Sequence, residues 1–215
     1  RRRTGVLSFN MFRVDAQHSY APPAQGPEWY GKILARNKFE GSVYVPHTGP
    51  LADALALAAV HPYIRRVVPR VSPDELATLP DHPPIVSVHL PHPTPDAMEI
   101  LRQRRLAAEI DARFWPFPAP VPVALDGMPA DGELPSNVYI KLTGFRLPAT
   151  PEQAQALRRL LRAPGPERLM FASGWPHGGA TWKETLAAFT QSLGAMPMAL
   201  REQLLGGTAA DFYQL

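Results

Sequence analysis

Short apolar stretches alternate with amphipathic stretches along almost the whole chain. The short stretches are rich in β-branched and aromatic residues, which is typical of buried β-strands. They predict eight strands, at about residues 11–17, 41–46, 65–70, 84–90, 106–112, 121–126, 137–142 and 168–173. Between them, apolar residues recur at the spacing of an amphipathic helix. This spacing predicts helices at residues 27–38, 51–60, 73–79, 95–104, 151–162, 180–193 and 197–205.

Strands that alternate with helices are typical of an α/β fold with parallel strands. We therefore expect one compact TIM-like (β/α)8 barrel over residues 11–215, preceded by an N-terminal extension at residues 1–10. Helices are expected to be missing after strands five and six, because residues 116–120 and 128–135 are short and proline-rich. An open doubly wound sheet is the alternative, although no glycine-rich phosphate loop follows any predicted strand.

Composition narrows the possible functions of the chain. Its 215 residues are 45% hydrophobic and 19% charged, which suits one globular core. It contains no cysteine, and this excludes disulfides, thiolate metal sites and a cysteine nucleophile. The net charge of +3 comes without an aromatic-basic motif, so nucleic-acid binding is not expected. No apolar run reaches the roughly 18 residues of a transmembrane segment.

The N-terminal sequence does not predict an export signal. Arg1, Arg2 and Arg3 precede an apolar stretch, but Asn10 and Arg13 interrupt it too early for the hydrophobic region of a signal peptide. The default expectation is therefore a cytoplasmic protein.

Segments 14–20, 37–43, 137–144, 167–178 and 205–215 carry the clearest motifs. They include Asp15-Ala16-Gln17-His18-Ser19, Lys141-Leu142-Thr143-Gly144 and Ser173-Gly174-Trp175-Pro176. In order and spacing these motifs resemble the amidohydrolase-related family, in particular its sugar-lactonase-like TIM barrels. The resemblance implies histidines and an aspartate at the carboxyl ends of the strands, where they would hold a metal or act as a general base.

At the positions where the resemblance implies these ligands, the chain has other residues. They are Gln17 and Ser19 in the first strand, Gly127 after the sixth and Gly174 after the last. Glutamine and serine are poor ligands for a catalytic zinc, and glycine has no side chain. We therefore expect no metal at this site and no other cofactor.

Several polar residues still lie near the predicted strand ends. His89, Arg113, Lys141 and Asp126 are weak catalytic candidates, and His47, Arg70 and His177 are candidates for ligand binding. The structural alternatives are that the histidines cap strands by backbone hydrogen bonds, that Lys141 forms an ion pair and that Asp126 accepts hydrogen bonds from backbone amides. For Lys141 the functional alternative is a Schiff-base amine.

Two functional hypotheses follow. The first is a degenerate, metal-free and non-catalytic amidohydrolase-like protein that serves as a binding or assembly subunit. The second is a metal-independent hydrolase or lactonase acting on a small lactone or carboxylate, with Arg70 and Arg113 as clamps and His89 as the base.

Residues 114–118, Phe-Trp-Pro-Phe-Pro, form an aromatic and proline-rich loop. It covers the barrel flank or, if exposed, marks an interface. A barrel without two helices leaves strand surface to be covered, so we expect a protein partner or self-association at Trp115 and Phe117.

Overall fold

The computed structural model describes residues 13–18, 27–46, 51–79, 87–91, 93–113, 134–162, 164–174 and 181–215. These residues form the parallel strands β1 (Val14–His18), β2 (Gly41–Tyr44), β3 (Ile64–Val67), β4 (Ser87–Leu90), β5 (Ala107–Arg113), β6 (Val138–Thr143) and β7 (Leu169–Phe171). The helices are α1 (Pro27–Arg36), α2 (Leu51–Val60), α3 (Pro73–Thr78), α4 (Pro95–Arg104), α5 (Pro151–Arg162), η2 (Pro166–Arg168), α6 (Trp182–Leu193), α7 (Met198–Glu202), η3 (Gln203–Gly207) and α8 (Thr208–Tyr213).

The strands lie side by side in the order in which they occur in the chain. Strands β1, β2 and β3 form one sheet, and β4, β5, β6 and β7 form the other. Among the described residues, β3 and β4 are joined by one bridge between Arg70 and His89. There the His89 amide donates to the Pro69 carbonyl at 2.8 Å, and the Val71 amide donates to the His89 carbonyl at 2.9 Å. The short contact leaves a seam between β3 and β4.

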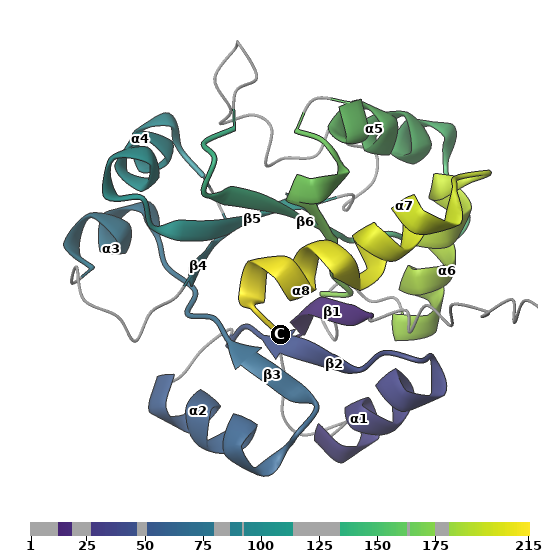
Figure 1. Cartoon of the computed structure of the whole chain (residues 1–215), viewed down its shortest axis with the longest axis horizontal. Helices are drawn as coiled ribbons and strands as arrows, with labels where there is room; N and C mark the ends of the chain where they lie inside the picture. Colours follow the sequence, from purple (N-terminus) through teal and green to yellow (C-terminus); the bar gives the residue numbers. More distant parts are fainter. Residues whose placement is uncertain are drawn as a thin grey trace, which may run out of the picture.

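The architecture is a TIM-like α/β barrel that is truncated and not closed. Helices α1 to α6 lie around the outside of the strands, whereas α8 lies in the middle of the view beside β1 (Figure 1). The end of β7 approaches β1, where the Ser173 amide donates to the Asp15 carboxylate at 2.8 Å. The predicted fold class is therefore confirmed. None of the described helices has the length and apolar character needed to cross a membrane.

Local capping explains where several helices begin. The Ser72 hydroxyl accepts from the Glu75 amide at 3.2 Å, and the Glu75 carboxylate accepts from the Ser72 amide at 2.7 Å. Thr181 and Glu184 form the same reciprocal pair before α6. Such capping boxes satisfy amide groups that the first turn of a helix leaves without partners.

The position expected for the sixth strand is wrong. That prediction put residues 121–126 between the strands at 106–112 and 137–142, but β5 pairs directly with β6 from Ala108↔Val138 to Arg113↔Thr143. The edge of β5 is thus already occupied. Residues 121–126 themselves lie outside the described residues. Pro122 is the relevant sequence signal, because a proline cannot donate to a strand ladder and is avoided in central strands.

The outer face of β5 and β6 is covered by the chain itself. Ile110 and Ile140 are completely buried and belong to the same core as Leu101 of α4 and Leu157 of α5. The described part of this flank therefore needs no second chain to cover it. Trp115 and Phe117, which we expected to cover it or to bind a partner, lie outside the described residues.

Candidate functional site

Polar side chains line the inner face of β4, β5 and β6. The apolar residues of these strands pack outward in the core shared with the helices. Successive side chains of a strand point to opposite faces, so the residues between them point into the barrel. These inward residues are His89, Glu109, Asp111, Lys141 and Thr143, and all are buried. By contrast, the interior beside β1, β2 and β7 is apolar, with Val14, Val43 and Met170.

Glu109 lies at the centre of this polar group. One carboxylate oxygen forms an ion pair with the Lys141 ammonium group and lies 3.6 Å from Nδ1 of His89. The other oxygen accepts a hydrogen bond from the hydroxyl of Tyr213 on α8. Nε2 of His89 lies 3.6 Å from Asp111. We call His89, Glu109, Asp111, Lys141 and Tyr213 the interior charge cluster.

Burial dominates the electrostatics of the cluster. It raises the pKa of Glu109 from its ordinary value to about 7, although the positive charge of Lys141 acts in the opposite direction. Burial also raises the pKa of Tyr213 well above its usual value, and the negative charge of Glu109 adds to this effect. Tyr213 therefore remains a neutral hydrogen-bond donor at physiological pH.

Helix α8 reaches the cluster from the amino-terminal side of the barrel. Its neighbour α7 is anchored there by a two-point ion pair between Glu202 and Arg13, which immediately precedes β1, with distances of 2.7 and 2.9 Å. Thr208 at the start of α8 donates to the carbonyl of Pro166, just before β7, at 3.0 Å. In TIM barrels this end contributes stability, and catalytic residues lie at the opposite end.

Asp15 is the centre of a second buried polar group, on the outer side of β1. Its carboxylate accepts hydrogen bonds from the Tyr30 hydroxyl of α1, from Nε1 of Trp182 on α6 at 2.8 Å and from the Ser173 amide at 2.8 Å. Burial raises the pKa of Asp15, while the hydrogen bonds from Ser173, Tyr30 and Trp182 lower it. Asp15 thus joins β1 to two helices and to the end of β7.

The positions expected for metal ligands are only partly described. Gly174 follows β7 with φ +63°, and a Cβ placed there would make an ordinary van der Waals contact with Cβ of Thr143 at 3.9 Å, while glycine itself has no side chain that could bind a metal. The backbone of Gln17 lies in β1, whereas Ser19 and Gly127 are outside the described residues. In the described ranges, no group of three histidine, aspartate or glutamate residues is arranged to hold a metal ion.

The remaining candidates are not all brought together. His89 and Lys141 meet in the interior charge cluster, and Arg70 shares the backbone bridge with His89. Arg113 ends β5 opposite Thr143, but only its backbone is described. His47, Asp126 and His177 lie outside the described residues.

Sequence reasoning missed Glu109 and Tyr213 as members of the cluster. A signal for Glu109 was available, because Glu109 and Asp111 alternate with alanine and isoleucine in the strand predicted at 106–112. Tyr213 lies in the closing motif, but nothing in its local sequence indicates that its hydroxyl contacts β5.

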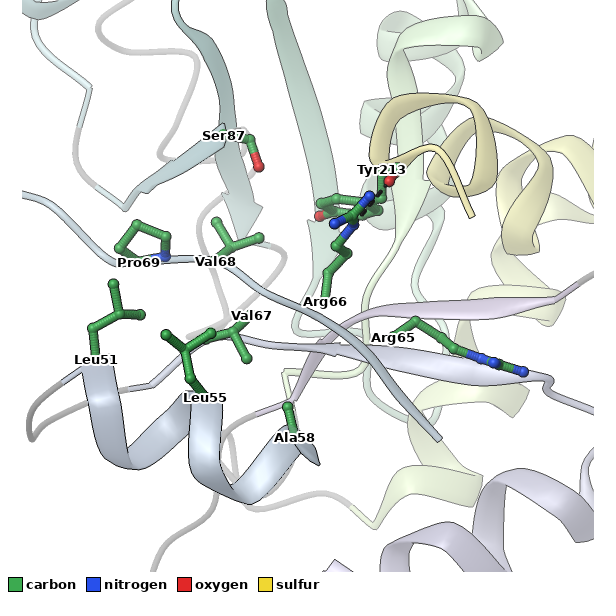
Figure 2. Close-up of a pocket in the computed structure, with 10 residues that line it drawn as sticks. All are labelled: Leu51, Leu55, Ala58, Arg65, Arg66, Val67, Val68, Pro69, Ser87 and Tyr213. Atoms are coloured by element: carbon green, nitrogen blue, oxygen red, sulfur yellow. Dashed lines mark hydrogen bonds between the residues drawn. The ribbon is translucent and has the colours of Figure 1, made fainter. Parts of the chain in front are cut away.

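A pocket of about 240 Å³ lies at the seam between β3 and β4, and we call it the seam pocket. Figure 2 shows α2 below it, β3 and the residues that follow along its side, and Ser87 and Tyr213 above. Its lining residues are Leu51, Leu55, Ala58, Arg65, Arg66, Val67, Val68, Pro69, Ser87 and Tyr213. Of the interior charge cluster, only Tyr213 contributes to this lining.

Comparison with known families agrees with this architecture. The family model described as amidohydrolase matches residues 1–215. The chain belongs to the amidohydrolase family. A search of curated proteins finds no match.

Solved structures of low sequence identity share the fold of this amidohydrolase-family chain. An amidohydrolase from Burkholderia multivorans is 21% identical, with a TM-score of 0.67 over 95% of this chain and 99% of that one. A protein from Agrobacterium tumefaciens is 16% identical, with a TM-score of 0.61 over 94% and 96%. A TIM-barrel protein from Bordetella bronchiseptica is 13% identical, with a TM-score of 0.53 over 87% and 82%. At these identities the likeness establishes the fold.

Proposed function

We propose that this member of the amidohydrolase family does not hydrolyse substrates through a metal centre and serves as a binding or assembly subunit. The observation that carries the proposal is the absence of ligand atoms at Gly174, the position where the resemblance implies the aspartate of the last strand. Neighbouring Thr143 and Ser173 offer hydroxyl groups, which are weak ligands and weak bases at neutral pH.

The interior charge cluster gives further support. Lys141 and His89 were catalytic candidates, but both are completely buried. Lys141 is paired with Glu109, and His89 lies between Glu109 and Asp111. A general base has to come within hydrogen-bond reach of the substrate proton. These side chains instead face one another in the barrel interior, which supports a structural role for the cluster.

Measurements of metal content and of hydrolysis together test whether the protein lacks a metal-dependent hydrolase activity. Protein expressed with added zinc or manganese should contain neither in stoichiometric amount, and it should not open sugar lactones with any added divalent ion. Replacement of Lys141 or His89 should leave this result unchanged. Turnover that requires a metal and disappears in a folded Lys141→Met or His89→Ala variant would reject the proposal.

The alternative, a metal-independent hydrolase or lactonase, makes a different prediction in the same assay. It requires lactone opening in the presence of a chelator, with loss of activity on His89→Ala replacement. Turnover that survives chelation and depends on His89 would favour this alternative. The burial of His89 between two carboxylates supports the non-catalytic proposal.

The assembly role can be tested at the aromatic loop. Trp115→Ser combined with Phe117→Ser should shift the protein to a smaller species in size-exclusion chromatography with light scattering. Val60→Ser is a suitable control, because Val60 is an exposed apolar residue elsewhere, on α2, with 68% of its surface accessible. An unchanged elution profile of the double variant would place the interface elsewhere.

A further inference from the structure

The walls of the seam pocket are mainly apolar. Leu51, Leu55 and Ala58 project from one side of α2 toward Val67 at the end of β3 (Figure 2). Leu55 is 52% exposed, so the pocket opens to solvent beside it. A concave apolar site with few polar groups is the usual form of a small-molecule pocket.

Arg66 supplies the charge of the pocket. Its Nε donates to the backbone carbonyl of Tyr213 at 3.0 Å, which fixes the guanidinium group at one wall (Figure 2). No carboxylate among the described residues pairs with Arg66, and none is among the residues that line the pocket. A guanidinium group has five N–H donors and stays charged at any physiological pH. The donors that Tyr213 does not use suit the two oxygens of a carboxylate.

Arg65 also lines the pocket. It is the preceding residue and has the same charge, but its side chain points away from the other labelled residues (Figure 2). Its guanidinium group donates to the Glu40 carbonyl at 3.2 Å. The guanidinium group of Arg65 is thus held at Glu40, and Arg66 is the better placed of the two to meet a bound anion.

We propose that the seam pocket binds a small carboxylate with an apolar body, whose carboxylate is held by Arg66 and whose body lies against α2 and β3. A cavity of about 240 Å³ is larger than a cavity of roughly 150 Å³ that holds benzene, so it suits a ligand of about ten non-hydrogen atoms. Benzoate and octanoate have this size and chemistry. The hydroxyl of Ser87 adds a polar group to the wall across from α2.

The seam pocket is separate from the residues on which the proposed absence of hydrolysis rests. It lies at the seam, and its walls do not include Gly174, Glu109 or Lys141. The hydrolysis assay therefore tests only the proposed function, and the binding measurement tests only the seam pocket.

Titration calorimetry with benzoate, octanoate and the neutral isostere benzamide tests the proposal on the full chain. Both carboxylates should bind, and benzoate should bind at least about tenfold more tightly than benzamide because only the carboxylate is charged. Arg66→Gln should weaken benzoate binding by about tenfold or more. Arg158→Gln removes the same charge from an exposed position on α5 outside the pocket lining, so it should change the affinity by less than about twofold.

Arg66→Gln removes the contact with Tyr213 and could disturb α8, so a second variant tests the pocket without this change. Leu55→Asp leaves Arg66 in place and alters a half-exposed residue. It puts a negative charge at the pocket mouth and should therefore also weaken benzoate binding by about tenfold. Four results would overturn the proposal: no carboxylate binding at millimolar concentration, equal binding of benzoate and benzamide, equal loss of affinity in the Arg158 and Arg66 variants, or unchanged affinity in Leu55→Asp.

Discussion

The hydroxyl of Tyr213 donates a hydrogen bond to the carboxylate of Glu109, although the two residues lie 104 positions apart in the chain. Tyr213 belongs to the last helix and Glu109 to a central strand. Both are buried, and Glu109 also carries the ion pair with Lys141. This one contact therefore links the position of α8 to the charge balance of the barrel interior.

Tyr213→Phe should destabilise the protein by about 1–3 kcal/mol, because the variant keeps the ring but removes a donor from a buried carboxylate. Urea unfolding followed by circular dichroism measures the change. Tyr139→Phe is the matched control. Tyr139 is only half-buried, and no hydrogen bond of its hydroxyl is seen in the described ranges, so its change should stay within about 0.5 kcal/mol. Equal effects of the two variants would contradict the role assigned to Tyr213.

The raised pKa of Glu109 predicts how stability depends on pH. The folded protein holds a proton on Glu109 up to a pKa of about 7, whereas the unfolded chain releases it near the ordinary value of 4.5. Folding thus takes up a proton between these values. The free energy of unfolding should therefore fall as pH rises through this window, by up to about 3 kcal/mol.

Glu109→Gln isolates this contribution. Urea unfolding from about pH 5 to about pH 8 should show a smaller fall in stability for the variant than for the unchanged protein. Asp15, His89, Asp111 and Lys141 are present in both proteins, so the difference between the two curves reports on Glu109. Parallel curves would show that Glu109 has the same pKa in the folded and unfolded states.

Lys141 and Glu109 should be energetically coupled. Lys141→Met alone leaves Glu109 without its cation and should cost about 3 kcal/mol, because breaking one side of a buried pair leaves an uncompensated polar group. The double variant with Glu109→Gln should lose less than the sum of the single variants. The exposed pair of Glu99 and Arg102 on α4 is the control cycle, in which solvent screening should leave far weaker coupling. Additive losses at Lys141 and Glu109 would show that the ion pair contributes nothing to stability.

Helices were well predicted because their signals are local. The ranges 51–60, 95–104 and 151–162 coincide with α2, α4 and α5. In α4, for example, Thr94 caps the first turn by accepting from the Ala97 amide at 3.2 Å, and Pro95 occupies the first helical position. Apolar spacing and a cap fix such a helix without information from the rest of the chain.

Strand neighbours and the buried cluster were harder to predict because they depend on distant contacts. Alternation placed β5 and β6 correctly within a few residues but could not show that they pair directly with each other. The contact of Tyr213 with Glu109 depends on where α8 docks, and no local pattern encodes this. The motifs predicted that Gly174 follows the last strand and that Lys141 lies in a strand. The residues that contact Lys141 could be identified only from the three-dimensional structure.

Gly174→Asp tests whether the carboxylate that the family resemblance implies at this position fits the fold. The backbone there has φ +63°, which aspartate tolerates better than most residues, and the nearest side-chain atoms belong to Thr143 at 3.9 and 4.0 Å. We expect a cost of about 1 kcal/mol, compared with about 2 kcal/mol or more for Gly174→Val, because a β-branched residue is strained in this conformation. Thermal unfolding measures both variants. A cost for Gly174→Asp as large as that for valine would mean that the end of β7 has no room for the carboxylate.

Metal analysis of the same Gly174→Asp protein should still show no stoichiometric zinc. The one introduced carboxylate lies beside Thr143 and Ser173, and a zinc site needs at least three protein ligands.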